Sequence, residues 1–198
     1  MKKIDFYREI AKLDKTEKNS LRLEQYSTDI DTAYEFIHFV DYNVGITGKT
    51  VADLGCGNGI LGISAALLGA SEVDLYDIDE KAVYFAKQNI EKLHINNAKS
   101  IHLDMFDVDK KYEIVVSNPP FGFQSNFSLS AFIKKVNSLA DNIFFIYKDN
   151  IEIRKIADSN GFLTHKIQDI KLEKTLSFHK KSYYSLPAVI VYKTTNKV

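Results

Sequence analysis

Residues 50–59, TVADLGCGNG, decide how this chain folds. The apolar run from Thr50 to Leu54 is short and ends at a glycine, which predicts a buried strand. The glycines after it predict a tight turn that opens a helix through Leu68, since glycine adopts backbone conformations closed to other residues. In open parallel sheets, ligands bind beyond the carboxyl ends of the strands. The stretch therefore predicts an α/β fold with a ligand site at the turn.

Strand and helix patterns alternate along the rest of the chain. Further strands are expected near 73–76, 100–103, 114–116 and 143–147, with helices at about 80–93, 128–139 and 151–159. Such alternation predicts a mostly parallel sheet with helices on both faces. The segments 165–176 and 188–192 then predict two strands that close the sheet as an antiparallel hairpin, which makes seven strands in all.

Two helical patterns precede the first strand. Apolar residues recur at helical spacing in 4–13, and a second helix is expected to begin with Thr28 as its N-cap. No repeat, low-complexity tract or linker interrupts the sequence. We therefore expect one domain, residues 1–198, made of a helical cap (1–45) and a Rossmann-like α/β core (46–198).

The composition narrows the classes of protein. Basic and acidic side chains number 26 each, so the net charge is zero and a nucleic-acid partner would need a local basic face. The single cysteine, Cys56, excludes an internal disulfide and is typical of a reducing compartment. None of the five histidines lies at metal-ligand spacing with it, so no zinc site is expected. With neither a signal-peptide pattern nor an apolar run of about 18 residues, we expect a cytoplasmic protein that does not enter a membrane.

The glycine spacing of the turn separates the possible cofactors. A dinucleotide fingerprint, G-x-G-x-x-G, would need its third glycine at the position of Ile60. The observed pattern is G-x-G-x-G, formed by Gly55, Gly57 and Gly59 and preceded by Asp53. A carboxylate suits the ammonium end of an amino-acid-like ligand and suits a pyrophosphate poorly. The turn therefore favours S-adenosylmethionine over a nicotinamide or flavin cofactor.

Two more carboxylates follow the next expected strands. Asp77 lies about 20 residues beyond the glycine turn, where an acid can accept hydrogen bonds from both ribose hydroxyls. Asp104 closes the third strand and could accept from the amino group of the cofactor's adenine. Either acid alone would fit a solvated turn. Three acids at three successive strand ends, next to the glycine turn, favour a cofactor site.

The fourth expected strand runs into Asn118-Pro119-Pro120-Phe121. The two prolines fix the backbone and leave its carbonyl groups rigidly aimed. If the Asn118 side-chain oxygen and the Pro119 carbonyl accept both N–H bonds of an amino group, the weakly nucleophilic nitrogen is held in line with a methyl donor. Phe121 is expected to offer a flat surface on which a flipped base stacks. A rigid turn would explain the tetrapeptide alone, but beside the glycine turn it indicates methyl transfer to an exocyclic amine.

Five short motifs occur together in this order: LEQYST at 23–28, DLGCGNG at 53–59, LGA at 68–70, DID at 77–79 and NPPFG at 118–122. They resemble the methyltransferase-like protein 5 family, class I enzymes that methylate N(6) of adenine in small-subunit ribosomal RNA. The similarity runs from about residue 21 to 132, with a weaker echo at 178–181. The sequence departs from the family pattern at Ser27, at Leu129 and in 146–149, which bears on RNA engagement more than on chemistry.

The resemblance implies roles that spacing alone does not assign. It implies a cofactor pocket formed by Gln25, Tyr26 and Thr28 and, around the adenosine, by Asp77, Ile78, Asp104 and Met105. It also implies a small zinc-ribbon activator protein that binds along a sheet edge and makes a heterodimer.

Basic residues gather beside the fifth strand and in the expected C-terminal loop. The candidates for RNA phosphate contacts are Lys148, His179, Lys180 and Lys181. A solvated lysine face explains the same pattern equally well, so the sequence leaves both interpretations open.

Three hypotheses for the function follow. The leading one is an N(6)-adenine methyltransferase that acts on structured RNA, in particular small-subunit ribosomal RNA. A rival keeps the chemistry but takes DNA adenine or a protein glutamine; the lack of a separate target-recognition domain argues against the first, and Phe121 in place of a tyrosine against the second. From another class comes a catalytically silent module that binds S-adenosylmethionine and stabilises a partner. Intact Asn118 and Pro119 argue against this module, since it has no need for them.

Overall fold

The computed structural model describes residues 1–14, 28–121, 127–173 and 183–195. The N-terminal elements are α1 (Lys3–Ile10) and α2 (Ile30–Val44). The alternating part follows as β1 (Thr50–Leu54), α3 (Ile60–Leu67), β2 (Glu72–Asp77), α4 (Glu80–Lys92), β3 (Ala98–His102), β4 (Ile114–Ser117), α5 (Leu129–Leu139), β5 (Asn142–Lys148) and α6 (Ile151–Ser159). The last described elements are β6 (Leu163–Lys166), β7 (Ile170–Glu173), β8 (Tyr183–Leu186) and β9 (Ala188–Lys193).

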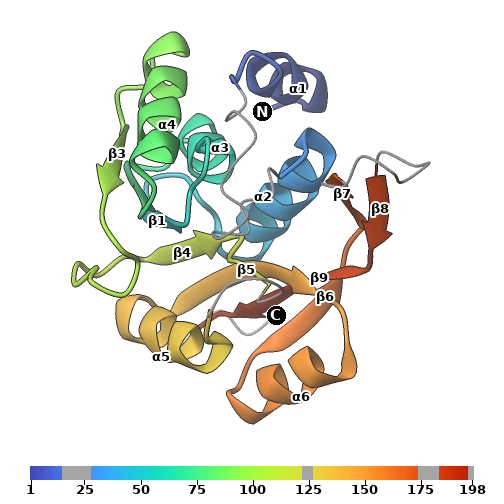
Figure 1. The fold of residues 1–198 in the computed structure, drawn as a ribbon. Coiled ribbons are helices and arrows are strands. Elements are labelled where there is room, and N and C mark those ends of the chain that lie inside the picture. The colour runs from blue at the N-terminus through green and yellow to red at the C-terminus, as the bar shows by residue number, and fades with distance from the viewer. Residues whose placement is uncertain (15–27, 122–126, 174–182, 196–198) are drawn as a thin grey trace.

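A seven-stranded sheet runs through the molecule in the order β3-β2-β1-β4-β5-β9-β6 (Figure 1). The first five strands in this order pair in parallel, and β9 runs antiparallel to both β5 and β6. The expected mostly parallel sheet with an antiparallel closing pair is thereby confirmed. The strand order reverses between β1 and β4, so the carboxyl ends of these two strands form the switch point where ligands of such sheets bind.

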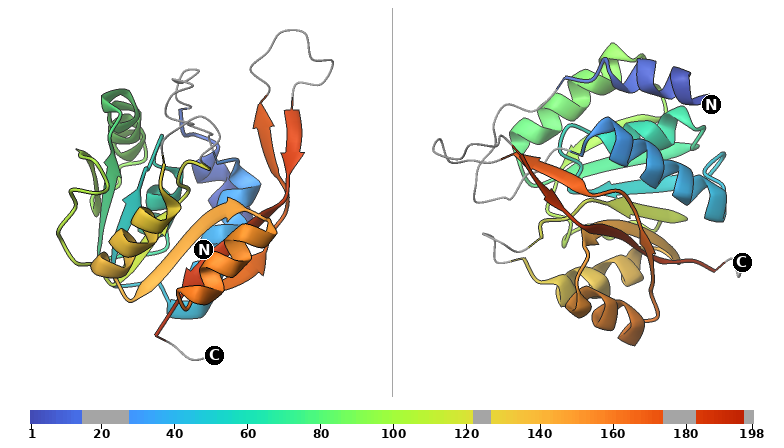
Figure 2. Two further views of the ribbon diagram at one scale, coloured as in Figure 1. Left: turned by 60° about the horizontal axis from the view of Figure 1, so that its bottom comes forward. Right: turned by 90° about the vertical axis from the view of Figure 1, so that its right-hand side faces the viewer.

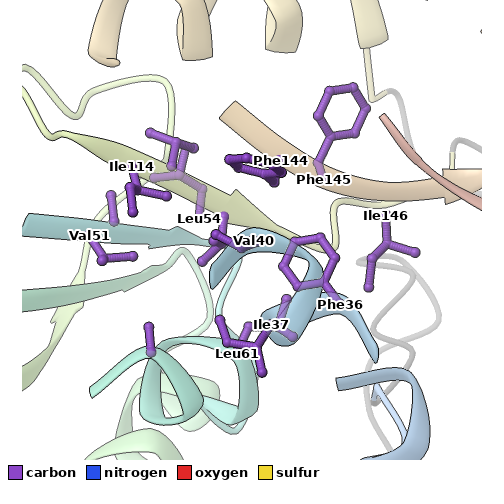
Figure 3. Packing of buried hydrophobic residues seen from close by; sticks show 14 of the residues in the cluster. Phe36, Ile37, Val40, Val51, Leu54, Leu61, Ile114, Phe144, Phe145 and Ile146 are labelled. Atoms are coloured by element: carbon purple, nitrogen blue, oxygen red, sulfur yellow. The ribbon is translucent and has the colours of Figure 1, made fainter. Parts of the chain in front are cut away.

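Helices cover both faces of the sheet. Figures 1 and 2 show α1 to α4 on one side and α5 and α6 on the other. Side chains from α2 and α3, including Phe36, Ile37 and Leu61, pack against one side of the central strands, whereas Phe145 points to the opposite side (Figure 3). There Phe145 contacts Phe132 of α5, with ring centroids 5.1 Å apart. These rings are fully buried, so each face of the sheet has its own apolar layer.

The single strand expected over 165–176 is wrong. The structure divides it into β6, which joins the main sheet, and β7, which pairs with β8 in a separate two-stranded sheet. Between them the Gln168 N–H donates to the Glu35 carboxylate at 3.2 Å instead of to a neighbouring strand. On the partner side Pro187 separates β8 from β9, and proline has no N–H with which to continue a ladder. The hairpin therefore changes sheets at this point.

The cap expected at the start of α2 is also wrong by one residue. Asp29, not Thr28, is the N-cap, because its carboxylate accepts from the Thr32 N–H at 2.9 Å. Asp79 is the N-cap of α4 and Ser128 that of α5, and their side chains accept from the N–H groups of Lys81 and Ala131. Within the described residues, no helix combines the length and apolar character needed to cross a bilayer.

Candidate active site

The glycine turn lies between β1 and α3, at the carboxyl edge of the sheet. Gly55 and Cys56 donate their N–H groups to the Tyr76 carbonyl, at 2.8 and 2.9 Å. Gly57 donates to the Asp77 carboxylate at 2.9 Å. Because these three donors are used inside the protein, the turn is a poor nest for a pyrophosphate. The geometry agrees with the exclusion of a dinucleotide.

The glycines of the turn serve different purposes. Gly59 and Gly57 both have positive φ angles, +87° and +56°, which L side chains rarely adopt. A Cβ at Gly59 would lie 2.9 Å from Leu75 Cδ2, so this glycine lets α3 pack on β2. A Cβ at Gly57 would meet no described atom within 4 Å, so Gly57 borders open space. Gly57 therefore marks the side of the turn that can receive a ligand.

Asp53 lies beneath the turn, and its side chain is 1% exposed. Its Oδ2 accepts from the Gly62 N–H at 2.8 Å and thereby satisfies a donor in the first turn of α3. Its Oδ1 is buried and has no hydrogen-bond partner among the described residues. Burial raises the pKa of Asp53 to about 7, a hydrogen bond from Gly62 opposes this, and the nearby Asp77 carboxylate adds to it. A cationic group that reached Oδ1 would supply the missing partner, as expected for the ammonium of the cofactor.

Asp77 ends β2 beside the turn and is 7% exposed. Its two oxygens accept from the N–H groups of Gly57 and Asp79, both at 2.9 Å. Burial raises the pKa of Asp77 despite these hydrogen bonds. A carboxylate offers about four acceptor positions, so the ribose hydroxyls expected here can still bind.

The residues expected around the adenosine lie at the same edge. Met105 follows β3, and its Cε would be 3.4 Å from a Cβ placed at Gly55, so the end of β3 meets the turn. Asp104 is half-buried, and its Oδ1 accepts from the Phe106 N–H at 2.9 Å. Ile78 is 53% exposed and thus available to a flat ligand. The structure therefore gathers these three side chains near the turn.

Asn118 follows β4 directly and is half-buried. The Ser117 hydroxyl donates to the Leu54 carbonyl at 2.7 Å, which joins the ends of β4 and β1. Asn118 therefore lies close to the turn. The Asn118 Nδ2 donates to the Thr28 hydroxyl oxygen at 2.9 Å. Its Oδ1 is buried without a hydrogen-bond partner in the described part of the chain. An acceptor is thus held ready next to the cofactor turn, with Pro119 and Pro120 immediately after it.

Phe121 does not take the expected position. The ring is 2% exposed and packs edge-on against Tyr147, with ring centroids 5.3 Å apart. The Tyr147 hydroxyl also donates to the Phe121 carbonyl at 3.2 Å. The prediction that this ring offers a flat stacking surface is therefore wrong for this conformation, because an aromatic residue next to the apolar β5 gains more from burial than from exposure.

Sequence reasoning missed one polar cluster that supports the turn. Asn89 of α4 is fully buried, and its Nδ2 donates to the carbonyls of Asn58 in the turn and of Asp14, at 2.9 and 3.1 Å. Its Oδ1 accepts from the Asp14 N–H at 2.7 Å. Asn89 lies in the apolar stripe of α4, next to Ile90. A polar residue in such a stripe indicates a buried, hydrogen-bonded side chain, and this could have identified the cluster from the sequence.

Several predicted site residues lie outside the described residues, namely Gln25, Tyr26, His179, Lys180 and Lys181. Lys148 is described, half-buried at the end of β5, with its Nζ 5.9 Å from the ring centroid of Tyr147. Over the ranges that the structure covers, no group of three or more histidine, cysteine, aspartate or glutamate side chains is placed to hold a metal ion.

The fold and the site together define a class of protein. A doubly wound sheet carries a glycine turn after β1, acids at the ends of β2 and β3, and asparagine–proline–proline after β4. Among the described residues, the open space at Gly57 and the oxygens of Asp53 and Asn118 that have no hydrogen-bond partner fit S-adenosylmethionine and its acceptor. The protein is a methyltransferase that uses S-adenosylmethionine as its cofactor.

Comparison with known proteins gives the family. The chain belongs to the methyltransferase small domain family, whose model matches residues 27–142. It is 31% identical to an uncharacterized protein of Methanocaldococcus jannaschii, over 85% of this chain and 83% of that one. It is 30% identical to the rRNA N(6)-adenosine-methyltransferase METTL5 of Danio rerio, over 87% of this chain and 88% of that one. The resemblance to the methyltransferase-like protein 5 family is thereby confirmed.

A solved structure agrees with this assignment. The crystal structure of a candidate RNA methyltransferase from Pyrococcus horikoshii superimposes with a TM-score of 0.85. The match covers 98% of each chain at 28% sequence identity.

Proposed function

We propose that this enzyme methylates the exocyclic N(6) amino group of an adenine in RNA, and that small-subunit ribosomal RNA is the substrate. The observation that carries the chemistry is the Asn118 Oδ1, a buried acceptor without a partner in the described residues, at the switch point of the sheet. The substrate class rests on the relatives, several of which are named rRNA N(6)-adenosine-methyltransferases.

The chain's own residues position the target and stabilise its charge. When bound, S-adenosylmethionine supplies a methyl group on a positively charged sulfur. Asn118 Oδ1 and the Pro119 carbonyl accept the two N–H bonds of the adenine amine, which orients the nitrogen lone pair toward that methyl. As the new N–C bond formed, the methyl–sulfur bond would break and leave a neutral thioether, so positive charge would move to the nitrogen, where these fixed acceptor dipoles stabilise it. The methylated nitrogen then loses a proton readily, so no strong base is needed.

The remaining site residues divide by the part of the cofactor that they bind. Asp53 lies below the turn on the side expected for the ammonium, and Asp77 lies where the ribose hydroxyls are expected. Ile78, Asp104 and Met105 are assigned to the adenosine by family resemblance. Gln25 and Tyr26 are assigned to the pocket by family resemblance, and Lys148, His179, Lys180 and Lys181 to RNA phosphates by charge.

The proposed partner is a small zinc-ribbon activator protein. In the main sheet β3 is an outermost strand, and an open strand edge is a common docking surface for a second chain. Co-expression with such a protein and size determination test this directly. A stable one-to-one complex supports the partner, and two separate species remove it.

The test of function is transfer of a labelled methyl group from S-adenosylmethionine to total RNA, DNA and protein. Wild type is compared with Asn118→Ala and with a control, Asn137→Ala, which changes an exposed asparagine on α5. If wild type is silent, the activator is added. We expect 6-methyladenine in small-subunit ribosomal RNA, a loss of about 100-fold or more in Asn118→Ala, and wild-type activity in the control.

The other outcomes decide between the alternatives. Label in DNA or on protein glutamine keeps the mechanism and replaces the substrate. Cofactor binding without transfer to any pool, with or without the activator, removes the catalytic role and favours a silent module that stabilises a partner.

A further inference from the structure

The catalytic asparagine is held by a residue from the N-terminal part of the chain, 90 positions away. The Thr28 hydroxyl oxygen accepts from Asn118 Nδ2 at 2.9 Å. We infer that Thr28 is a positioning residue, which fixes the Asn118 amide so that its oxygen, not its nitrogen, faces the adenine amine. The inference rests on the proposed role of Asn118 and assigns Thr28 a task beyond contact with the cofactor.

Thr28 is itself held in a defined place. It precedes Asp29, whose carboxylate accepts from both the Thr32 N–H and the Thr32 hydroxyl, each at 2.9 Å. Thr32 is 1% exposed, and about one helical turn further on α2 buries Phe36 in the core. The hydroxyl that meets Asn118 therefore stands on the capped start of a packed helix, which makes it a stable reference point.

The orientation of an asparagine amide has chemical consequences. Oxygen and NH2 are nearly equal in size, so a half-turn about the last side-chain bond exchanges an acceptor for a donor at little steric cost. With Nδ2 bonded to Thr28, Oδ1 has no hydrogen-bond partner among the described residues, and it is the acceptor that a target amine requires. Without Thr28, the amide can turn its NH2 toward the NH2 of adenine, where neither group accepts. The loss then falls on the transfer step, since the turned amide no longer accepts from the target amine.

This role can be separated from cofactor binding. A hydroxyl can accept from an amide NH2 or donate to an amide oxygen, so Thr28 selects this orientation when its own proton is donated to a second acceptor, such as an oxygen of the cofactor. Thr28→Val keeps the shape and removes the hydroxyl, whereas Thr28→Ser keeps the hydroxyl. The matched control is Thr47→Val, which removes an exposed hydroxyl hydrogen bond to the Leu68 carbonyl before β1, away from the carboxyl ends of the strands.

The first measurement is the transfer rate to small-subunit ribosomal RNA at saturating S-adenosylmethionine, alongside the Kd for the cofactor. We expect Thr28→Val to lower this rate about tenfold, while its Kd stays within about twofold of wild type. Thr28→Ser should recover most of the rate that Thr28→Val loses, and Thr47→Val should match wild type in both. A weakened Kd with an unchanged saturated rate in Thr28→Val would overturn the inference and leave Thr28 as a cofactor contact only.

A double-mutant comparison separates failure of this inference from failure of the proposed function. If Thr28 acts through Asn118, Thr28→Val has no further effect on the rate in an Asn118→Ala background. An additive loss there contradicts the inference. If Asn118→Ala alone transfers methyl as well as wild type, the proposed function of the site fails instead.

A measurement without activity completes the test. In the ¹⁵N spectrum of the cofactor-free protein, the Asn118 side-chain amide should give two well-separated proton signals, because one N–H is bonded to Thr28. Thr28→Val should bring these signals together and speed their exchange with solvent, and Thr28→Ser should keep them apart. Identical Asn118 amide signals in Thr28→Val and wild type mean that the hydrogen bond does not hold the amide.

Discussion

Two aspartates on neighbouring strands show how differently one chain can treat a buried carboxylate. Asp53 of β1 and Asp74 of β2 are each 1% exposed, and the strand register places them on opposite faces of the sheet. Asp74 accepts from Lys110 and from the Tyr112 hydroxyl, at 2.8 and 2.6 Å, and forms an ion pair with Lys99 at 3.2 Å. Within the described chain, Asp53 receives one hydrogen bond, from a backbone N–H.

The two carboxyl groups shift in opposite directions as a result. Burial by itself would raise the pKa of Asp74, but the hydrogen bonds from Lys110, Tyr112 and Lys99 outweigh it and lower the pKa. At Asp53 the single backbone donor does not offset burial, and the pKa rises to about 7. A buried charge needs partners. At Asp74 two lysines and a hydroxyl compensate the charge, although Oδ1 meets Lys99 only as an ion pair, and the group serves stability. At Asp53 no cation among the described residues compensates the charge, and such a carboxylate marks a place for a ligand.

The largest effect is expected from Asp74→Ala. Removing this carboxylate leaves Lys99, Lys110 and the Tyr112 hydroxyl without their shared acceptor, which should lower the free energy of unfolding by about 3 kcal/mol. This loss of unfolding free energy is at the lower end of the range for buried ion pairs, because both lysines are partly exposed. Urea unfolding at pH 7 measures it.

The pH dependence of that effect follows from the lowered pKa. The folded protein binds the Asp74 proton more weakly than the unfolded chain does, in which the pKa of an aspartate is about 3.9. The stabilisation is therefore complete above that pH and is lost as the pH falls through the folded value. A gap between wild type and Asp74→Ala that stays constant down to pH 2 would argue against the lowered pKa.

Asp53→Asn should raise the stability at high pH, whereas Asp74→Ala lowers it. Between about pH 4 and 7 the folded wild type retains a proton that the unfolded chain releases, so its stability falls as the pH rises through this window. The asparagine variant is free of this loss and should be more stable than wild type at pH 8 by about 1 kcal/mol, once an unpartnered NH2 is allowed for. Its melting temperature without cofactor tests this.

The same substitution should weaken cofactor binding. Wild-type affinity for S-adenosylmethionine is expected to rise as the pH passes upward through about 7, because the Asp53 carboxylate then pairs with the ammonium. Asp53→Asn should bind about tenfold more weakly at pH 8 and show no such rise. Equal affinity in the two proteins across this range means that Asp53 supports only α3.

The smallest effect is expected from Glu72→Gln, at the rim of the Asp74 cluster. Glu72 pairs with Lys99 and Lys110 at 3.0 and 2.9 Å, but all three side chains are 40% or more exposed. Solvent screens such pairs, so the unfolding free energy should change by about 0.5 kcal/mol or less. A loss as large as that of Asp74→Ala would show that the rim, not the buried acid, holds the cluster together.

The features that the sequence predicted correctly depend on local chemistry. Thr50 to Leu54 was expected as a strand and is one, residue for residue, because an apolar run that stops at glycines leaves few alternatives. Asp53 and Asp77, at the ends of the first two strands, lie beside the turn as expected, since parallel strands present their carboxyl ends at one edge.

Contacts between distant segments explain the failures. The break between β6 and β7 depends on Pro187 and Glu35, neither of which is near in sequence. Phe121 is buried because Tyr147 of β5 lies over it. The bond from Asn118 to Thr28 spans 90 positions and has no periodic pattern. Such contacts depend on the packed fold, so no sequence motif predicts them.

The place of β9 in the sheet sets an order of events during synthesis. β5 has β9 as its outer neighbour, and in the main sheet β6 pairs with β9 alone. At translation rates of about 5–20 residues per second, the apolar edge of β5 waits for seconds until residues 188–193 leave the ribosome. A nascent chain that stalls in this interval presents NIFFIYK as a bare edge, the kind of strand that other chains readily join. Of the described strands, β9 is therefore made after β5 and β6 and covers an edge of each.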